Sequence, residues 1–222
     1  MGQMITLSAH DGHRLGAYEA QPTGRARGAV VVVQEIFGVN GHIRRVADGY
    51  AASGYRVVAP ALFDRVRPGI ELGYTDADIA EGRSIREKIT FDHALADVAA
   101  ARDALRETGR VGVVGYCWGG TVTWLAAARL EGFAAASSYY GGGIGKFAGE
   151  SPRCPMQCHF GDRDHAISLD EVDAVRKANP GVQVFVYSAG HGFNCDERAS
   201  YDATSAALAR ERTLELFRAH LG

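Results

Sequence analysis

The sequence lacks the features that mark membrane, secreted and nucleic-acid-binding proteins. It has no run of about 18 uninterrupted apolar residues, so no membrane-spanning helix is predicted. Its first residues show no basic segment followed by an apolar one, which predicts no signal peptide and a soluble, cytoplasmic protein. Acidic and basic residues nearly balance, with a formal net charge of −2. We therefore expect neither a nucleic-acid nor a membrane partner.

Cysteine is scarce, and its spacing indicates no metal site. The four cysteines include no Cys-x-x-Cys pair and no spacing typical of zinc binding. Cys154 and Cys158 flank one apparent strand, where about 3.3 Å per residue separates them by about 13 Å, too far for a disulfide. Cys158 and His159 are adjacent in that strand, so their side chains point to opposite faces. We expect free thiols, no metal and no cofactor.

Internal repeats and low-complexity linkers are also absent. The 222 residues suit one domain with a sizeable core, because about 100–200 residues per domain is usual and α/β domains often run longer. Hydrophobic residues make up 46% and charged residues 23%, an ordinary balance for a globular protein. The sequence therefore predicts a single α/β domain over residues 1–222.

Strand-like and helix-like segments alternate along the chain. The N-terminal stretch alternates in polarity and turns at Asp11-Gly12, which predicts a β-hairpin. Further strands are predicted near 29–34, 55–60, 111–114, 133–141, 155–161 and 182–188. Helices are predicted at 42–53, 118–130, 169–178 and 201–220, with two more in 76–108 that break near Thr90 or Phe91. This order predicts a mostly parallel, doubly wound sheet of about eight strands with helices on both faces.

A nucleophile turn is predicted at Cys117. Residues 111–120 read VGVVGYCWGG, which combines a buried strand, a Gly-x-Cys-x-Gly turn and the start of a helix. A nucleophile at such a turn takes a strained backbone conformation, and Gly115 and Gly119 let strand and helix pass without a Cβ clash. The usual nucleophile at this turn is serine. Taken alone, the pattern fits a tight turn with a buried cysteine equally well.

Two later loops carry the partners that such a nucleophile needs. An α/β-hydrolase places its nucleophile, acid and histidine in that chain order, at the carboxyl ends of successive strands. Asp162 and Asp164 follow the strand at 155–161, and His191 follows the strand at 182–188. This conjunction favours an enzyme. The stretch 141–155 is too short for a helical lid, so we expect an open site and a small substrate.

The chain resembles the dienelactone hydrolase family, whose best-known activity is that of carboxymethylenebutenolidase. The resemblance runs from the N-terminal hairpin to the last helix, and it implies an α/β-hydrolase fold without a lid domain. The cysteine turn together with QEIFGVN is specific to the family, whereas the acid and histidine loops are shared by α/β-hydrolases generally. The matching segments are 34–40 (QEIFGVN), 115–120 (GYCWGG), 139–141 (YYG), 161 with 164–165, and 190–193 (GHGF).

The resemblance implies roles for the residues of the three loops. Cys117 would attack an ester or lactone carbonyl, with His191 as general base and later as acid. Asp164 would hold the imidazole in its working tautomer. The family places its acid three residues after Gly161, which favours Asp164 over Asp162. Asp162 would then serve the turn.

The loop after the strand at 29–34 is implied to complete the site. The backbone N–H groups of Ile36 and Trp118 would form the oxyanion hole. The family's matching glutamate keeps the thiol neutral until substrate arrives, and we carry that role to Glu35. An alternative remains open, in which Glu35 only pairs with an arginine.

Substrate contacts are less defined by the resemblance. Family members bind the carboxylate of dienelactone with two arginines, and Arg83 or Arg86 lies in about the right place for the first. The second of these arginines follows the catalytic histidine in the family. Here Cys195 stands four residues after His191 instead, and the nearest arginine is Arg198. Aromatic residues could line the pocket as well; these are Tyr74, Tyr139 and Tyr140.

The sequence therefore predicts a cofactor-free cysteine hydrolase of small esters or lactones. A general carboxylesterase or thioesterase with the same triad is the alternative within enzymes. A non-catalytic, redox-sensing relative is the alternative outside them, although a sensor thiol requires neither Asp164 nor His191. The sequence specifies neither the physiological substrate nor the oligomeric state.

Overall fold

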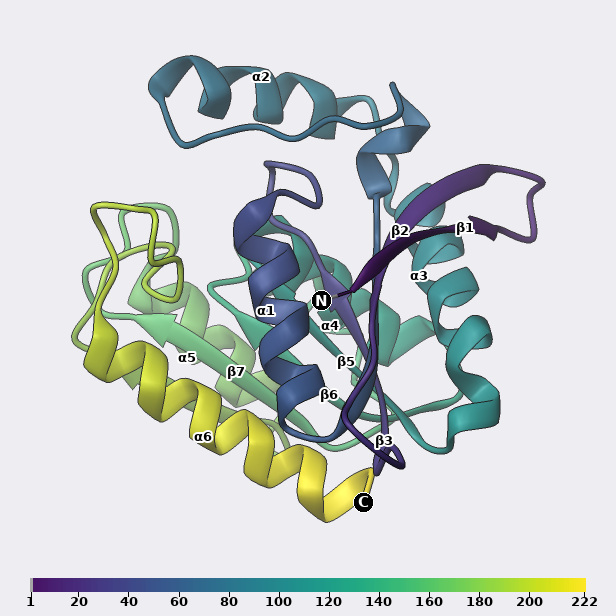
Figure 1. The fold of residues 1–222 in the computed structure, drawn as a ribbon. Coiled ribbons are helices and arrows are strands. Elements are labelled where there is room, and N and C mark those ends of the chain that lie inside the picture. The colour runs from purple at the N-terminus through teal and green to yellow at the C-terminus, as the bar shows by residue number, and fades with distance from the viewer. Residues whose placement is uncertain (1) are drawn as a thin grey trace.

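Eight strands form one sheet in the order β1-β2-β4-β3-β5-β6-β7-β8 in the computed structural model, which describes residues 2–222 (Figure 1). β1 pairs with β2 and β2 with β4 in antiparallel fashion, and every other pair is parallel. The predicted mostly parallel sheet with an antiparallel hairpin is thus confirmed. The strands are β1 (Gln3–Ser8), β2 (Arg14–Ala20), β3 (Gly28–Val33), β4 (Tyr55–Pro60), β5 (Val111–Tyr116), β6 (Phe133–Tyr139), β7 (Met156–Gly161) and β8 (Gln183–Tyr187).

Helices cover both faces of the sheet, as predicted. Figure 1 shows α1 and α6 together in front of the sheet, with α3, α4 and α5 behind it. Within residues 2–222, no helix combines the length and apolarity needed to cross a membrane. The helices are α1 (Gly41–Ala52), α2 (Asp76–Glu87), α3 (Phe91–Leu105), α4 (Trp118–Arg129), α5 (Leu169–Ala178) and α6 (Ala203–His220), with short 3₁₀ helices at Leu62–Arg65, Arg106–Thr108 and Ile144–Phe147.

Polar caps set where the helices begin. The break in the segment 76–108 falls at Thr90, whose side chain accepts a hydrogen bond from the N–H of His93 and so starts α3. The last helix begins two residues later than predicted. Asp202 caps it by accepting from the N–H of Ser205, so Tyr201 lies outside it.

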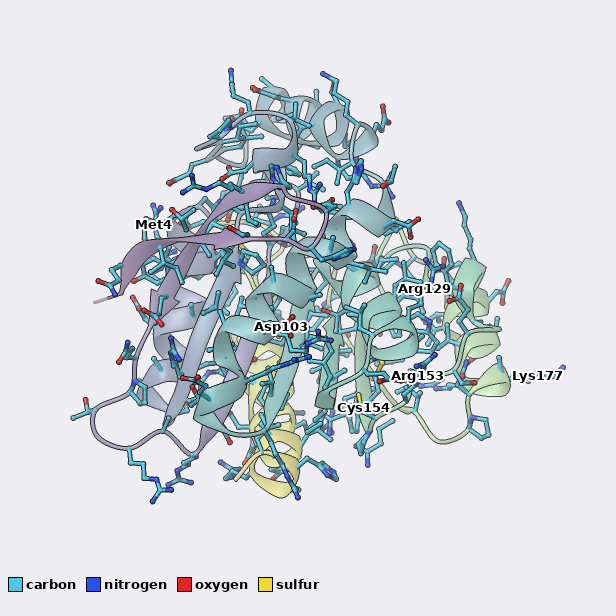
Figure 2. All side chains as sticks on the ribbon, turned by 90° about the vertical axis from the view of Figure 1, so that its right-hand side faces the viewer. Met4, Asp103, Arg129, Arg153, Cys154 and Lys177 are labelled. Carbon is cyan, nitrogen blue, oxygen red and sulfur yellow. The ribbon has the colours of Figure 1, made fainter. Side chains whose placement is uncertain are left out.

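The central parallel strands are buried along their whole length. Every residue of β3 and β5 is buried, as expected for strands covered on both faces by helices. β1 forms an outer edge of the sheet, where the side chain of Met4 is 57% exposed (Figure 2). Because β3, β5, β7 and β8 run in parallel, their carboxyl ends share one edge of the sheet, and the loops that follow them meet there.

Helix α2 stands apart from the layers around the sheet (Figure 1). It precedes the cysteine turn in the chain, and its side chains form one wall of a cavity described below. The stretch 141–155 contains only the 3₁₀ turn Ile144–Phe147, in agreement with the expectation that it builds no helical lid. The helix that forms a wall of the cavity, α2, therefore comes from a segment before the cysteine turn rather than after it.

Candidate active site

Cys117 lies at a sharp turn between β5 and α4. Its backbone angles are φ 55° and ψ −120°, which L residues rarely adopt. A Cβ at Gly115 would lie 2.1 Å from the carbonyl oxygen of Gly119, and a Cβ at Gly119 would lie 2.3 Å from that of Gln34. Only glycine fits at these two positions, which confirms the reason for the Gly-x-Cys-x-Gly pattern.

The structure brings the three residues of the predicted triad into one line of contacts. His191 Nε2 lies 3.2 Å from Cys117 Sγ, and His191 Nδ1 lies 2.8 Å from Asp164 Oδ2. The other carboxylate oxygen of Asp164 accepts a hydrogen bond of 2.8 Å from the N–H of Ala166, which orients the group. Asp164 is buried, whereas Asp162 is exposed and lies beside Arg163. Of the two aspartates in this loop, Asp164 is the one that contacts the imidazole.

The neighbours of His191 raise the pKa of its imidazole. Burial by itself lowers the pKa of His191, because a low-dielectric environment disfavours the imidazolium. The sulfur of Cys117 and the carboxylate of Asp164 act in the opposite direction, and together they raise the pKa of His191 to about 10. A charged sulfur and the carboxylate therefore both favour the protonated ring.

Tyr140 supports the histidine from one side. Its ring packs edge-on against the ring of His191, with centroids 5.2 Å apart. Its backbone has φ 37°, and its N–H donates to the carbonyl oxygen of His159 at 2.7 Å. Strained backbone of this kind persists only where the surroundings impose it. The sequence suggested Tyr140 as a lining residue, but the side chain is buried and positions His191 instead.

The backbone N–H groups of Ile36 and Trp118 were predicted to form the oxyanion hole. The hydrogen bonds found among residues 2–222 include neither the N–H of Ile36 nor that of Trp118. Trp118 is the first residue of α4, where the N–H groups have no partner within the helix and the helix dipole is positive. Both residues line the same cavity as Cys117. Their role as an oxyanion hole stays a prediction.

A cavity of about 370 Å³ opens over the thiol. Its size suits a small ligand. Apolar side chains and three guanidinium groups dominate its walls, and α2 contributes both of the arginines predicted near this place. The lining residues are Ile36, Phe37, Ile79, Arg83, Arg86, Glu87, Cys117, Trp118, Gly142, Ala166, His191 and Arg198.

Arg198 reaches this cavity from the loop between β8 and α6. Its guanidinium carbon lies 5.8 Å from the centroid of the Phe37 ring. Gly192 makes room for it, because a Cβ there would lie 2.4 Å from Arg198 Nη1, and the backbone at Gly192 has φ 80°. Although Cys195 departs from the family pattern, the loop thus still supplies an arginine. The only trace of this approach in the sequence is the glycine at position 192, and the spacing from His191 did not reveal which arginine enters the cavity.

Glu35 is fully buried in the loop after β3, two residues beyond the end of the strand. Its Oε1 lies 3.6 Å from Arg198 Nη1. The hydrogen bonds found among residues 2–222 include none between this carboxylate and Cys117. The structure thus shows the arrangement in which the thiol faces His191 and the glutamate faces an arginine.

Tyr139 does not lie where a substrate contact was expected. Its side chain is completely buried, and its hydroxyl lies 2.8 Å from Thr213 Oγ1 on α6. It is not among the residues that line the cavity over Cys117. The reason is the alternation of side chains along β6, which turns Tyr139 towards the face covered by α6.

Catalytic side chains on loops at the carboxyl edge of such a sheet are characteristic of the α/β-hydrolases, and the present chain has that fold. Comparison with known proteins identifies the family within the α/β-hydrolases. Residues 15–221 match the sequence model of the dienelactone hydrolase family. The chain belongs to this family, and it is a hydrolase that acts on ester or lactone bonds of small molecules.

Three relatives illustrate how close the similarity is. A carboxymethylenebutenolidase from Pseudomonas putida is 34% identical over 223 residues, which cover 95% of this chain and 94% of the relative. A protein from Synechocystis sp. provisionally assigned the same activity is 35% identical over 230 residues, covering 94% and 93%. The crystal structure of a Klebsiella pneumoniae protein provisionally assigned as a dienelactone hydrolase superposes with a TM-score of 0.84 at 29% identity, covering 97% of this chain and 99% of that one.

Proposed function

We propose that this hydrolase works through a cysteine nucleophile, with Cys117 attacking the substrate and His191 and Asp164 assisting. The observation that carries the proposal is the line of contacts from Sγ to Nε2 at 3.2 Å and from Nδ1 to Oδ2 at 2.8 Å. The strained turn supports it further, because it lifts the sulfur out of the sheet towards the cavity.

Acylation follows from the positions of these groups. The sulfur of Cys117 bonds to the carbonyl carbon, and the π electrons move to the carbonyl oxygen, which faces the N–H groups of Ile36 and Trp118. When the carbonyl re-forms, the C–O bond to the leaving group breaks, and His191 gives its proton to the leaving oxygen. The result is a thioester on Cys117. With a lactone, the released hydroxyl stays attached to the acyl chain.

Deacylation uses the same histidine in reverse. The neutral imidazole of His191 takes a proton from a water molecule, and the hydroxyl oxygen bonds to the thioester carbon. Collapse of the second tetrahedral intermediate breaks the C–S bond and releases the carboxylic acid. Cys117 returns as the thiolate beside a protonated His191, so one water molecule is consumed in each cycle. Asp164 stabilises the charged ring throughout.

The charges around the cavity support a substrate that carries a carboxylate. Arg83, Arg86 and Arg198 all line the cavity, against one exposed carboxylate from Glu87. A guanidinium group binds a carboxylate through two parallel hydrogen bonds, which gives both affinity and orientation. We therefore propose a small acidic ester or lactone as the substrate class.

Glu35 is proposed to control the reactivity of the thiol. In the free enzyme, a carboxylate that accepts a hydrogen bond from the Cys117 thiol would keep the thiol neutral and protect it from oxidation. A substrate carboxylate that binds Arg198 would alter the charge next to Glu35 and release the thiol to His191. Glu35→Gln and Glu35→Asp should therefore change the rate at which iodoacetamide alkylates Cys117. An unchanged alkylation rate in both variants would contradict this role.

One assay tests the central proposal. The protein should release p-nitrophenol from p-nitrophenyl acetate, iodoacetamide should abolish the activity, and Cys117→Ala should be inactive. Cys154→Ser is the matched control, because Cys154 lies on the segment before β7, and it should remain active and still be inactivated by iodoacetamide. Equal rates for Cys117→Ala and the unmodified protein would rule out the mechanism. Rates with cis- and trans-dienelactone would then separate a lactone hydrolase from a general carboxylesterase or thioesterase.

A further inference from the structure

Three side chains of the kinds that bind metals meet behind the wall of the cavity. Glu35 follows β3, His42 lies in the first turn of α1, and Cys195 lies in the loop before α6. One carboxylate oxygen, one imidazole nitrogen and the sulfur all lie within 4.8 Å of one another. The three residues are 0%, 3% and 0% exposed, respectively. Since they come from distant segments, no spacing in the sequence pointed to them.

Among the described residues, three buried polar atoms in this cluster lack hydrogen-bond partners, namely both carboxylate oxygens of Glu35 and Nε2 of His42. Buried polar atoms are almost always paired, so each unpaired one needs an explanation. The nearest cation, Arg198 Nη1, lies 3.6 Å from the carboxylate, beyond hydrogen-bond distance. Unpaired acceptors that converge on one point are what a cation site provides.

The Nδ1 nitrogen of His42 contacts a carboxylate, as the non-ligating nitrogen of a metal-binding histidine usually does. This nitrogen lies 3.2 Å from Oδ1 of Asp196, which also pairs with Arg45 at 3.1 Å. A histidine that donates its Nδ1–H to a carboxylate presents a lone pair on Nε2, and this second contact fixes the ring and raises its basicity as a ligand. Here Nε2 is the buried nitrogen without a partner.

We propose that Glu35, His42 and Cys195 form a binding site for a divalent zinc ion, with Asp196 as the residue that positions His42. Bonds of about 2.0–2.3 Å in tetrahedral geometry place ligand atoms about 3.3–3.8 Å apart, so small side-chain rotations suffice. The proton of the Cys195 thiol passes to solvent when the sulfur binds the metal. Sulfur and nitrogen ligands favour Zn²⁺ over Mg²⁺ and Ca²⁺, which prefer oxygen alone. The site shares Glu35 with the proposed thiol control but does not depend on it.

The test measures metal binding rather than hydrolysis. Cys117→Ala serves as the parent chain, so that the thiol beside His191 cannot bind the probe. After treatment with a chelator, this chain is dialysed against Zn²⁺ and its metal content is measured. A parallel titration with Co²⁺ follows the near-ultraviolet absorption of a thiolate–cobalt bond. We expect one ion per chain and a thiolate–cobalt band.

Variants then assign the ion to the cluster. In the Cys117→Ala chain, Cys195→Ser should abolish the thiolate–cobalt band. His42→Gln should weaken Zn²⁺ binding by at least about 100-fold. Asp196→Asn, which only removes the group that positions His42, should weaken it less, by about 10–100-fold. Cys154→Ser should leave binding unchanged, because Cys154, labelled beside Arg153 in Figure 2, precedes the amino end of β7, whereas Glu35 follows the carboxyl end of β3. Circular dichroism of each metal-free variant checks its fold.

Three results would overturn the proposal. The first is a Cys117→Ala chain that binds less than one ion or shows no thiolate–cobalt band, a result that requires no further variant to fold. The second is an ion that remains bound in folded Cys195→Ser and His42→Gln. The third is binding that occurs only when Cys117 is present, which would place the ion in the active site. None of these results bears on ester hydrolysis, so failure here is distinct from failure of the proposed mechanism.

Discussion

Arg198 Nη1 lies 3.6 Å from Glu35 Oε1, so the cation nearest to this fully buried carboxylate also lines the catalytic cavity. A substrate that takes up the guanidinium group must therefore affect the carboxylate. The fold provides this coupling because the loop after β3 and the loop before α6 meet at one edge of the sheet. Stability and substrate binding are both expected to depend on this pair.

Removing the cation should destabilise the protein. Arg198→Gln leaves Glu35 buried without a counter-charge, and breaking a buried pair in this way typically costs about 3–5 kcal/mol. The free energy of unfolding from urea titrations at neutral pH gives the loss. Arg198→Lys keeps the charge and should lose much less. The double variant Glu35→Gln/Arg198→Gln should recover most of the stability, and a double variant as unstable as Arg198→Gln would show that the pair does not interact.

The same arginine should discriminate between substrates. With p-nitrophenyl hydrogen succinate, which carries a carboxylate, Arg198→Gln should raise KM by at least about tenfold, equivalent to about 1.4 kcal/mol of binding. With p-nitrophenyl acetate, which has no carboxylate, KM should change little. Steady-state kinetics with the two esters measure the difference. An equal rise in KM for both would count against a carboxylate contact at Arg198.

The two aspartates of the loop after β7 should behave differently. Asp164→Asn replaces the oxygen that faces His191 Nδ1 with an amide that donates, so the ring takes the wrong tautomer, and kcat should fall by about 10³–10⁴. Asp162→Asn is the matched control, because its side chain is exposed, and kcat should stay within about twofold of the unmodified enzyme. Similar losses in both variants would refute the assignment of Asp164.

Much of the fold and the order of the site loops could be predicted from the sequence. Continuous apolar strands alternate with amphipathic helices, and this order leaves few topologies, because parallel crossovers are right-handed. The ends of parallel strands then share one edge, which brings the loops with Cys117, Asp164 and His191 together. The catalytic residues in these loops can therefore be located from the order of the strands, without knowing how the side chains pack.

Other features depended on packing that no local pattern reveals. Tyr139 sits at the end of β6, and whether it faces the cavity or α6 depends on how β6 aligns with the adjacent strands. Arg198 reaches the cavity only because the loop after His191 folds back over Gly192. The cluster that includes His42 and Cys195 assembles from separate segments, so its members show no characteristic spacing.

A buried histidine away from the cavity should make the protein sensitive to acid. Burial, with a smaller contribution from Arg212, lowers the pKa of His159 to about 3. Its ring lies 2.8 Å from Tyr187 Oη and 3.3 Å from Thr213 Oγ1. The folded chain therefore binds fewer protons than the unfolded chain between about pH 3 and pH 6.5, and stability falls as pH falls through this range.

The size of this effect can be isolated with one variant. Each pH unit below about 6.5 costs about 1.4 kcal/mol, so acidification from pH 7 to pH 5 should remove about 2 kcal/mol through His159. His159→Gln keeps hydrogen-bonding capacity but does not titrate. Urea titrations at both pH values should show a loss about 2 kcal/mol smaller in this variant than in the unmodified protein. The same loss in both proteins would mean that His159 titrates normally in the folded state.

Gly192 should be required for the position of Arg198 in the cavity, because it leaves space that a side chain would fill. Gly192→Ala forces a Cβ onto a backbone with φ 80°, which costs about 1–2 kcal/mol, and places it 2.4 Å from Arg198 Nη1, so the arginine must move. KM for p-nitrophenyl hydrogen succinate should rise as it does in Arg198→Gln. Gly190→Ala is the control on the other side of His191, since its nearest atoms lie 3.7 Å away. It should bind the ester normally. If Gly192→Ala binds the acidic ester as well as Gly190→Ala does, the position of Arg198 does not determine recognition of the carboxylate.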